Sequence, residues 1–281
     1  MMEPDLFSQI DFESVLKRQR ELSSFGERGA GMWNARAAKR RKGGAGRDAA
    51  YARAVLGMMD LEGVETALDV GCGGGNLAIP LAQKGIRVEA LDFSEGQLAR
   101  LAENAEAAGV AMGSGTNLVA RQLAWADDWA AAGVQKADLA ICSRAMDFGE
   151  LKACLSKLND WAKKRCFLVL HSGGSYLGPD VMGLLERPLH PRADYIYAVA
   201  MLYQLGVRAE VRFLESEGGM TYGSAGEFVE SVRWRVGELT AREEERLEGL
   251  YAGLERDAEG RARYDHPFTW AVLTWEKGGA E

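Results

Sequence analysis

The sequence contains few of the residues on which several common chemistries depend. It has three histidines, six prolines and four cysteines among 281 residues. No two cysteines are spaced as Cys-x-x-Cys, so the sequence indicates neither a disulfide framework nor a zinc site, and no metal site is expected. The first residues lack the basic and then apolar pattern of a signal peptide. We therefore expect a reducing compartment and a cytoplasmic location.

Long apolar runs and an excess of positive charge are also missing. No stretch approaches the roughly 18 uncharged apolar residues of a membrane span, which argues against contact with a membrane. The net charge is -7 and the sequence pI is about 5.3, so nucleic acid is an unfavourable partner because its phosphates need broad neutralisation. Hydrophobic residues make up 47% of the chain, enough to bury a large core.

Glycine is concentrated at one informative place. The short apolar stretch over residues 66–70 is followed by Gly71, Gly73 and Gly75. A strand that leads into several glycines and then a helix is typical of a nucleotide-binding turn. Glycine is favoured there because it adopts backbone conformations closed to other residues and lets a ligand approach the main chain closely.

Two acids accompany this turn. Asp69 lies two residues before the first glycine, and Asp92 ends the next apolar stretch, 86–91. A carboxylate at the end of the second parallel strand can accept both hydroxyl groups of a ribose. A dinucleotide fingerprint, Gly-x-Gly-x-x-Gly, would need glycine at position 76, which is Asn76, so an NAD-dependent oxidoreductase is disfavoured.

This Asp-x-Gly-x-Gly-x-Gly pattern resembles the first motif of the class I S-adenosylmethionine-dependent methyltransferases, and Asp92 resembles the acid of their second motif. The resemblance covers about residues 66–172 and extends in outline to the C-terminus. It implies a site for S-adenosyl-L-methionine, whose cationic groups favour a nearby carboxylate. The residues implied to surround its methionine part are Asp69, Gly71, Cys72, Gly73 and Gly75. Asp92 would bind the ribose and Phe93 would lie against the adenine.

Strand-like and helix-like patterns alternate from residue 64 and predict an α/β fold, a parallel sheet with helices on both faces. The expected strands are 66–70, 86–91, 118–123, 137–142, 166–170, 207–214 and 268–275. The resemblance implies a Rossmann-like, doubly wound, seven-stranded sheet with an antiparallel last strand. Residues 1–60 are expected to form an N-terminal helical cap, and 61–281 the methyltransferase domain with a helical insertion at about 173–205.

Local signals also predict where helices begin and end. Asn76 is expected to cap a helix that runs to Lys84, and Ser94 a helix that stops at Gly109. A further helix is expected over 150–164, and two more over 227–236 and 241–254.

The acceptor side of the site is harder to interpret. The fourth strand ends in Cys142-Ser143-Arg144, without the Asn-Pro-Pro-aromatic or Pro-Cys sequences typical of base methyltransferases. Ser143 is either a contact to the methionine carboxyl group or the acceptor, or a simple turn residue. Arg144 is a candidate for neutralising a carboxylate or phosphate of the acceptor. His171, at the end of the fifth strand, is either a catalytic base or a histidine satisfied by local contacts.

Further candidates lie outside the glycine turn. By resemblance, an acid after the third strand should reach the adenine amino group, and we prefer Asp127 to Asp128, which could instead begin a helix. Trp33, in the sequence Trp-Asn-Ala-Arg-Ala, resembles a segment that folds over the cofactor in many small-molecule methyltransferases; it could equally anchor a helix. Three tyrosines of the insertion could line the acceptor pocket or pack within the insertion: Tyr176, Tyr195 and Tyr197.

These observations predict a methyltransferase that acts on a small molecule. Transfer from a sulfonium is an in-line displacement with a neutral leaving group, so alignment and exclusion of water matter more than catalytic side chains. Two alternatives stay open: an RNA methyltransferase that uses the basic segment 36–47, and a regulator that binds the cofactor without turnover. The sequence leaves the oligomeric state open.

Overall fold

The computed structural model describes residues 6–23, 29–39, 45–146, 150–173, 177–186, 190, 193–216 and 218–277. The chain divides into two compact units. The larger consists of Glu27–Leu170, Ala198–Leu214 and Ala271–Glu281, and the smaller of Met1–Gly26, His171–Tyr197 and Glu215–Trp270. The expected division into a cap over 1–60 and a methyltransferase domain over 61–281 stays a prediction.

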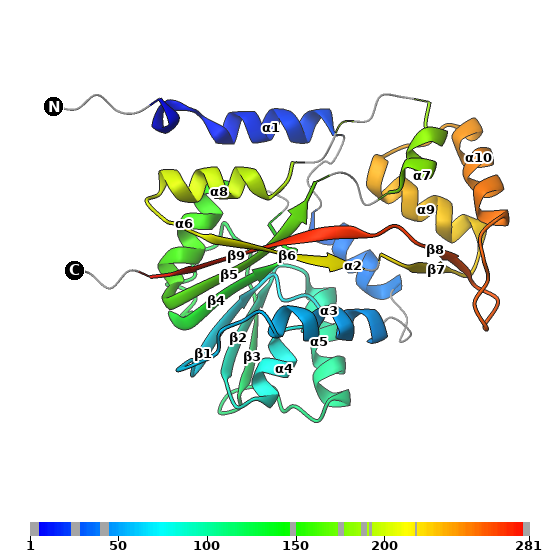
Figure 1. Cartoon of the computed structure of the whole chain (residues 1–281). Coiled ribbons are helices and arrows are strands. Elements are labelled where there is room, and N and C mark those ends of the chain that lie inside the picture. The colour runs from blue at the N-terminus through cyan, green and yellow to red at the C-terminus, as the bar shows by residue number, and fades with distance from the viewer. Residues whose placement is uncertain are drawn as a thin grey trace. The chain divides into compact units, whose positions relative to one another are not determined.

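Seven strands form the main sheet, in the order β3-β2-β1-β4-β5-β9-β6 (Figure 1). Their bounds are β1 Thr66–Val70, β2 Arg87–Asp92, β3 Leu118–Gln122, β4 Ala137–Ser143, β5 Ala162–Ser172, β6 Glu210–Ser216 and β9 Phe268–Glu276. Strands β1 to β5 pair in parallel, and the arrow of β9 runs opposite to that of β5 in Figure 1, so β9 is the antiparallel strand. The predicted Rossmann-like α/β fold is therefore confirmed.

The strand order reverses between β1 and β4. The chain winds from β1 outward to β3 and then returns to place β4 on the other side of β1. In open parallel sheets, ligands bind in the crevice beyond the carboxyl ends of the strands at such a switch point. The register brings these ends level, because Val70 lies opposite both Leu91 of β2 and Cys142 of β4.

Within its described residues, the larger unit contains five helices that precede β1 or lie between its parallel strands. They are α2 Ala30–Lys39, α3 Ala45–Leu56, α4 Ala78–Gln83, α5 Glu95–Ala107 and α6 Leu151–Trp161. Helix α4 packs on β2 and β3, α5 on the same two strands, and α6 on β4. Helix α8, Tyr195–Gln204, lies within the predicted insertion.

The helix ends test the local predictions. Ser94 caps α5, its hydroxyl oxygen accepting a hydrogen bond from Gln97 N at 3.2 Å. The expected cap at Asn76 is wrong: α4 begins two residues later, and its N-cap residue, Leu77, makes no side-chain capping bond. The glycine turn therefore continues past Asn76 and delays the first helical residue to Ala78.

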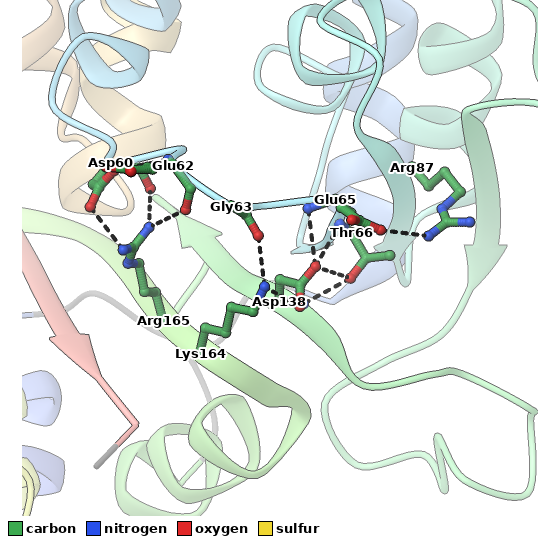
Figure 2. A network of polar contacts seen from close by, with 9 residues as sticks. All are labelled: Asp60, Glu62, Gly63, Glu65, Thr66, Arg87, Asp138, Lys164 and Arg165. Carbon is green, nitrogen blue, oxygen red and sulfur yellow. Dashed lines mark hydrogen bonds and ion pairs between the residues drawn. The ribbon is translucent and has the colours of Figure 1, made fainter. Parts of the chain in front are cut away.

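The predicted helix over 150–164 is too long. Helix α6 ends at Trp161, and β5 begins at Ala162 instead of residue 166. The basic residues at the start of β5 bind the loop that precedes β1 (Figure 2). Arg165 Nη1 donates to the carbonyl oxygens of Asp60 and Glu62, at 3.2 and 2.9 Å. The strand therefore starts early enough to place these side chains beside the loop before β1.

Asp138, at the start of β4, fixes the other end of the same loop (Figure 2). Its Oδ2 accepts hydrogen bonds from Glu65 N, Thr66 N and Thr66 Oγ1 at 3.0 to 3.1 Å, and Lys164 Nζ lies 3.2 Å from Oδ1. Burial tends to raise the pKa of Asp138, but these donors lower it to about 2. The carboxylate thus holds the start of β1 in register with β4.

The smaller unit has a core of its own. Besides η1 Phe7–Gln9 and α1 Phe12–Leu22, it contains α7 Pro179–Leu184, α9 Ala225–Val236, α10 Ala241–Ala252 and the antiparallel pair β7 Met220–Tyr222 and β8 Ala262–Tyr264. Phe228 and Leu247 are among its fully buried side chains. The helices α9 and α10 confirm the sequence prediction, whereas the three-residue strands β7 and β8 were not predicted.

Gly75 limits the packing of α4 against α5, and this generates a stability prediction. Its φ is +83°, and a Cβ there would lie 2.2 Å from Leu101 Cδ1 and 2.9 Å from Ile79 Cδ1. Gly85 has a similar φ of +87° but open space around it. We expect Gly75→Ala to lower the free energy of unfolding by about 2 to 4 kcal/mol, and Gly85→Ala by about 1 kcal/mol.

Urea unfolding of the ligand-free protein measures both values. The difference between the two variants isolates the packing contribution, because the backbone strain is alike. Equal losses in both variants would show that the contact with Leu101 does not constrain this turn.

Candidate cofactor and acceptor site

The predicted cofactor residues gather where β1 and β2 end. Asp69 is the second-last residue of β1 and Asp92 the last of β2. The turn between β1 and α4 is tied to the neighbouring strand: the Leu91 carbonyl oxygen accepts hydrogen bonds from Gly71 N at 2.7 Å and Cys72 N at 3.0 Å. The glycine turn is thereby held over the end of β2.

Asp92 fixes this turn with both carboxylate oxygens. Gly73 N donates to Oδ2 and Ser94 N to Oδ1, each at 2.9 Å. The side chain is buried, and burial raises its pKa, although the two backbone donors oppose this effect. A carboxylate oxygen has more than one lone pair, so both oxygens keep acceptor capacity for a ligand hydroxyl group.

Asp69 lies deeper than Asp92. It is 2% exposed, and burial, with a smaller contribution from the charge of Asp92, raises its pKa to about 7. A buried carboxyl group of this kind is neutral or charged according to small changes around it. A cation placed beside it would favour the charged form.

The glycines create the space that the turn needs. Gly71 has a φ of +70°, and a Cβ there would lie 2.2 Å from Ala145 Cβ, in the segment after β4. Gly73 also has a positive φ of +53°. Asn104 Nδ2, from α5, donates to the Gly74 carbonyl oxygen at 2.7 Å. Burial raises the pKa of Cys72 well above its usual value, so its thiol is a packing group and not a nucleophile.

Helix α2 supplies a residue that sequence reasoning did not single out. Asn34 Oδ1 accepts hydrogen bonds from Ser94 Oγ at 2.7 Å and Gly96 N at 3.0 Å. It thus binds the first turn of α5, directly after Asp92 and Phe93. Trp33, its half-buried neighbour, was predicted to lie over the cofactor. Asn34 is the second residue of the Trp-Asn-Ala-Arg-Ala sequence that drew attention to Trp33, so this sequence could have identified it.

Two polar residues lie at or just after the end of β3: Asp127, which was predicted to reach the adenine, and Gln122, which was not singled out. Asp127 is exposed, and its Oδ2 accepts a hydrogen bond from Ala124 N at 2.7 Å. Gln122, the last residue of β3, lies opposite Asp92 in the register and donates to the Phe93 carbonyl oxygen at 3.3 Å. The register could have identified Gln122, since it ends the strand next to β2. The adenine role of Asp127 stays a prediction.

The end of β4 brings together Ser143, Arg144 and a tyrosine from α3. Tyr51 Oη and Ser143 Oγ are 2.6 Å apart and hydrogen-bonded. The Arg144 guanidinium carbon lies 3.9 Å from the centre of the Tyr51 ring. Tyr51 was not predicted, because no sequence pattern shows that α3 reaches the end of β4.

His171 belongs to the smaller unit. It is buried near the end of β5, with its ring centre 6.0 Å from those of Phe268 and Trp270. Its role as a base stays a prediction. Tyr195 and Tyr197 lie in the first turn of α8, whereas Tyr176 and residues 40–44 of the basic segment lie outside the described residues.

Searches for metal and membrane features used the described residues alone. Within them, no three or more His, Cys, Asp or Glu side chains form a group that could hold a metal ion. The helices in the same part of the chain are too short or too polar to span a membrane.

Comparisons with known proteins agree with this geometry. A family model described as a methyltransferase domain matches residues 67–165. An uncharacterized protein of Haemophilus influenzae is 33% identical over 248 residues, which cover 86% of this chain and 88% of that protein.

The fold is also found in a solved structure. A protein from Bacillus halodurans C-125, provisionally described as a methyltransferase, aligns with a TM-score of 0.55 and 17% identity over 82% of this chain and all of that one. Magnesium protoporphyrin IX methyltransferase from Synechocystis PCC 6803, with bound S-adenosylhomocysteine, aligns with a TM-score of 0.49 and 16% identity over 94% of this chain and 95% of that one.

The matched segment begins in β1 and ends in β5, so it contains the glycine turn, both buried aspartates and the end of β4. The sequence motif, the strand order and the family match therefore agree on one assignment. The chain belongs to the class I methyltransferases, enzymes that use S-adenosyl-L-methionine as their cofactor.

Proposed function

We propose that this enzyme transfers the methyl group of S-adenosylmethionine to a small-molecule acceptor by in-line displacement. One observation carries the proposal: a glycine turn that Asp92 holds through Gly73 N and Ser94 N, beside the buried carboxyl group of Asp69. The net charge of -7 supports a small acceptor over nucleic acid. The cytoplasmic location stays a prediction.

The residues of the turn fit this cofactor. Gly71 and Gly75 let the turn pack against Ala145 and Leu101, since a Cβ at either position would collide with them, whereas at Gly73 the nearest atom to a Cβ would be 3.8 Å away. Asp92 has acceptor capacity for the two ribose hydroxyl groups, and Asp69 would lie near the cationic methionine part. Phe93 would lie against the adenine, with Asp127 or Gln122 as polar partners.

Bound S-adenosylmethionine supplies an electrophilic methyl group. The task of this chain is then alignment of the acceptor and exclusion of water, which contribute most to a displacement of this kind. Asn34 would hold the first turn of α5 in place beside the cofactor, since its side chain accepts hydrogen bonds from Ser94 and Gly96. Ser143 and Arg144 would face the acceptor across the switch point.

Labelled-methyl transfer tests the function. The full chain is incubated with S-adenosylmethionine labelled in its methyl group and, separately, with a small-metabolite fraction and with total RNA. We expect label in the metabolite fraction only. Label in RNA would support the RNA alternative, and binding of the cofactor with no labelled product in either fraction would indicate a regulator without turnover.

The ribose assignment predicts a specific loss of affinity. Asp92→Ala should weaken binding of S-adenosylhomocysteine by about 1 to 3 kcal/mol, the range for hydrogen bonds to a charged group. The exposed Asp160 is the matched control, and Asp160→Ala should leave the affinity unchanged. Calorimetry measures both.

A pair of ligands separates ribose binding from a general effect on the turn. The wild-type protein should prefer adenosine to 2′,3′-dideoxyadenosine, and Asp92→Ala should lose most of that preference. If the variant discriminates between the two ligands as the wild type does, Asp92 does not bind the ribose hydroxyl groups.

The raised pKa of Asp69 predicts how stability depends on pH. The folded protein keeps this proton up to about pH 7, while the unfolded chain loses it near the ordinary value of 3.8. The folded state therefore binds more protons between about pH 4 and pH 7, and stability from this group falls as pH rises through that window. The asparagine side chain of Asp69→Asn cannot ionise, so this variant avoids the loss. We expect the free energy of unfolding of ligand-free Asp69→Asn, relative to that of the wild type, to rise by about 2 to 4 kcal/mol between pH 4 and pH 8.

Urea unfolding at several pH values checks this expectation, with Asp160→Asn as the exposed control. If the free energies of unfolding of wild type and Asp69→Asn differ by the same amount at every pH in the window, Asp69 is ionised throughout. A cationic ligand would then have no proton to displace from it.

A further inference from the structure

Lys157, on α6, binds the loop that follows β3. Its Nζ donates to the carbonyl oxygens of Trp125 and Asp127, at 2.8 and 2.6 Å. The same ammonium group lies 4.1 Å from the ring centre of Trp129, a distance at which a cation is attracted to an indole face. The side chain is half-buried, and burial lowers the pKa of Lys157. Three partners therefore hold a charge that is partly withdrawn from water, and they fix the loop to the helix.

The β3 loop, residues 123–129, is also held by contacts of its own. Trp129 is fully buried, and its Nε1 donates to the Ala124 carbonyl oxygen at 2.8 Å. Asp127 Oδ2 accepts a hydrogen bond from Ala124 N at 2.7 Å. The rings of Trp125 and Trp129 have their centres 5.3 Å apart. These contacts define one shape for the loop, so a ligand that binds it does not have to order it first.

The β3 loop lies next to both parts of the proposed cofactor site. It begins beside the ribose acid, because Leu123 N donates to the main-chain oxygen of Asp92 at 3.1 Å. Farther along, Trp125 Nε1 donates to the Ala145 carbonyl oxygen at 3.3 Å. Ala145 in turn lies where a side chain at Gly71 would be. A ligand with its ribose at Asp92 and its methionine part at the glycine turn would extend its base toward this loop.

Asp127 is the group of the β3 loop that suits the adenine amino group. It is exposed, and a carboxylate oxygen has more than one lone pair. The bond from Ala124 N therefore leaves the carboxylate acceptor capacity for a donor on a ligand. Lys157 binds the main-chain oxygen of this same residue, so it sets the position of the carboxylate through the backbone.

We propose that Lys157 is a positioning residue for the cofactor, and that it acts through Asp127, whose carboxylate accepts a hydrogen bond from the adenine amino group. Lys157 itself touches neither the base nor the reacting atoms. The arrangement selects the base: a ligand with a carbonyl oxygen in place of the amino group would set two acceptors against each other. This inference rests on the proposed function, which places the adenine on the β2–β3 side of the site.

Base selectivity tests the proposal without knowledge of the methyl acceptor. Calorimetry compares S-adenosylhomocysteine with S-inosylhomocysteine, in which a carbonyl oxygen replaces the amino group. We expect the wild type to prefer the first ligand by about tenfold or more, as for a hydrogen bond to a charged group. Lys157→Met should reduce this preference to about threefold, because the carboxylate loses its fixed position. Asp127→Asn should bind the two ligands within about twofold, because an amide can accept from one and donate to the other.

Two controls separate positioning from a general loss of stability. Lys163→Met removes the same charge from an exposed residue near the start of β5 and should keep the wild-type preference. The double variant Lys157→Met with Asp127→Asn should show the preference of Asp127→Asn alone, since a residue that acts through Asp127 has nothing more to lose. A lower folded fraction affects both ligands alike, so it leaves their ratio unchanged.

Four results would overturn the inference. The first is the full wild-type preference in Lys157→Met, and the second is equal affinity of the wild type for the two ligands. The third is the full preference in Asp127→Asn, which would assign the amino group to another partner. The fourth is a greater loss in the double variant than in Asp127→Asn. A wild type that binds neither ligand would instead contradict the proposed function itself.

Discussion

The burial of two carboxyl groups at the ends of neighbouring strands is the constraint on which the site depends. Asp92 gives the glycine turn its shape, since its two oxygens accept the Gly73 and Ser94 amides. Asp69 is confined behind it, with a pKa raised to about 7. Glycine at positions 71 and 75 is a second constraint on the turn, because side chains there would collide with Ala145 and Leu101. Burying the two acids has an electrostatic cost that a cationic ligand can offset.

The switch point divides the site into two halves, and each half is completed by a helix that precedes the sheet in sequence. On the β2 side, Asn34 of α2 binds the first turn of α5. On the β4 side, Tyr51 of α3 holds Ser143 and Arg144. Helices α2 and α3 therefore each contribute a polar side chain that holds one half of the site in place. This arrangement suits an enzyme whose main contribution is alignment.

The sheet and the cofactor turn could be predicted from sequence because their signals are local. Apolar strands, the Asp69 and glycine spacing and the caps at Ser94 and Gly109 all lie within short windows. The three-residue strands β7 and β8 give too short a pattern to recognise, and Asn76 was misjudged as a cap because the turn runs longer than its composition suggests. Asn34 and Tyr51 were missed for another reason. Their partners lie 60 and 92 positions away, and only the docking of α2 and α3 brings them together.

Proton release on cofactor binding tests the central claim most directly. Calorimetry of S-adenosylmethionine binding at pH 7, in buffers of different ionisation enthalpy, gives the number of protons exchanged by the wild type and by Asp69→Asn. A buried carboxyl group with a pKa near 7 is about half protonated at that pH, and a cation beside it should expel that proton. The account predicts that the wild type releases about half a proton more than Asp69→Asn. Equal proton exchange by the two proteins would contradict it.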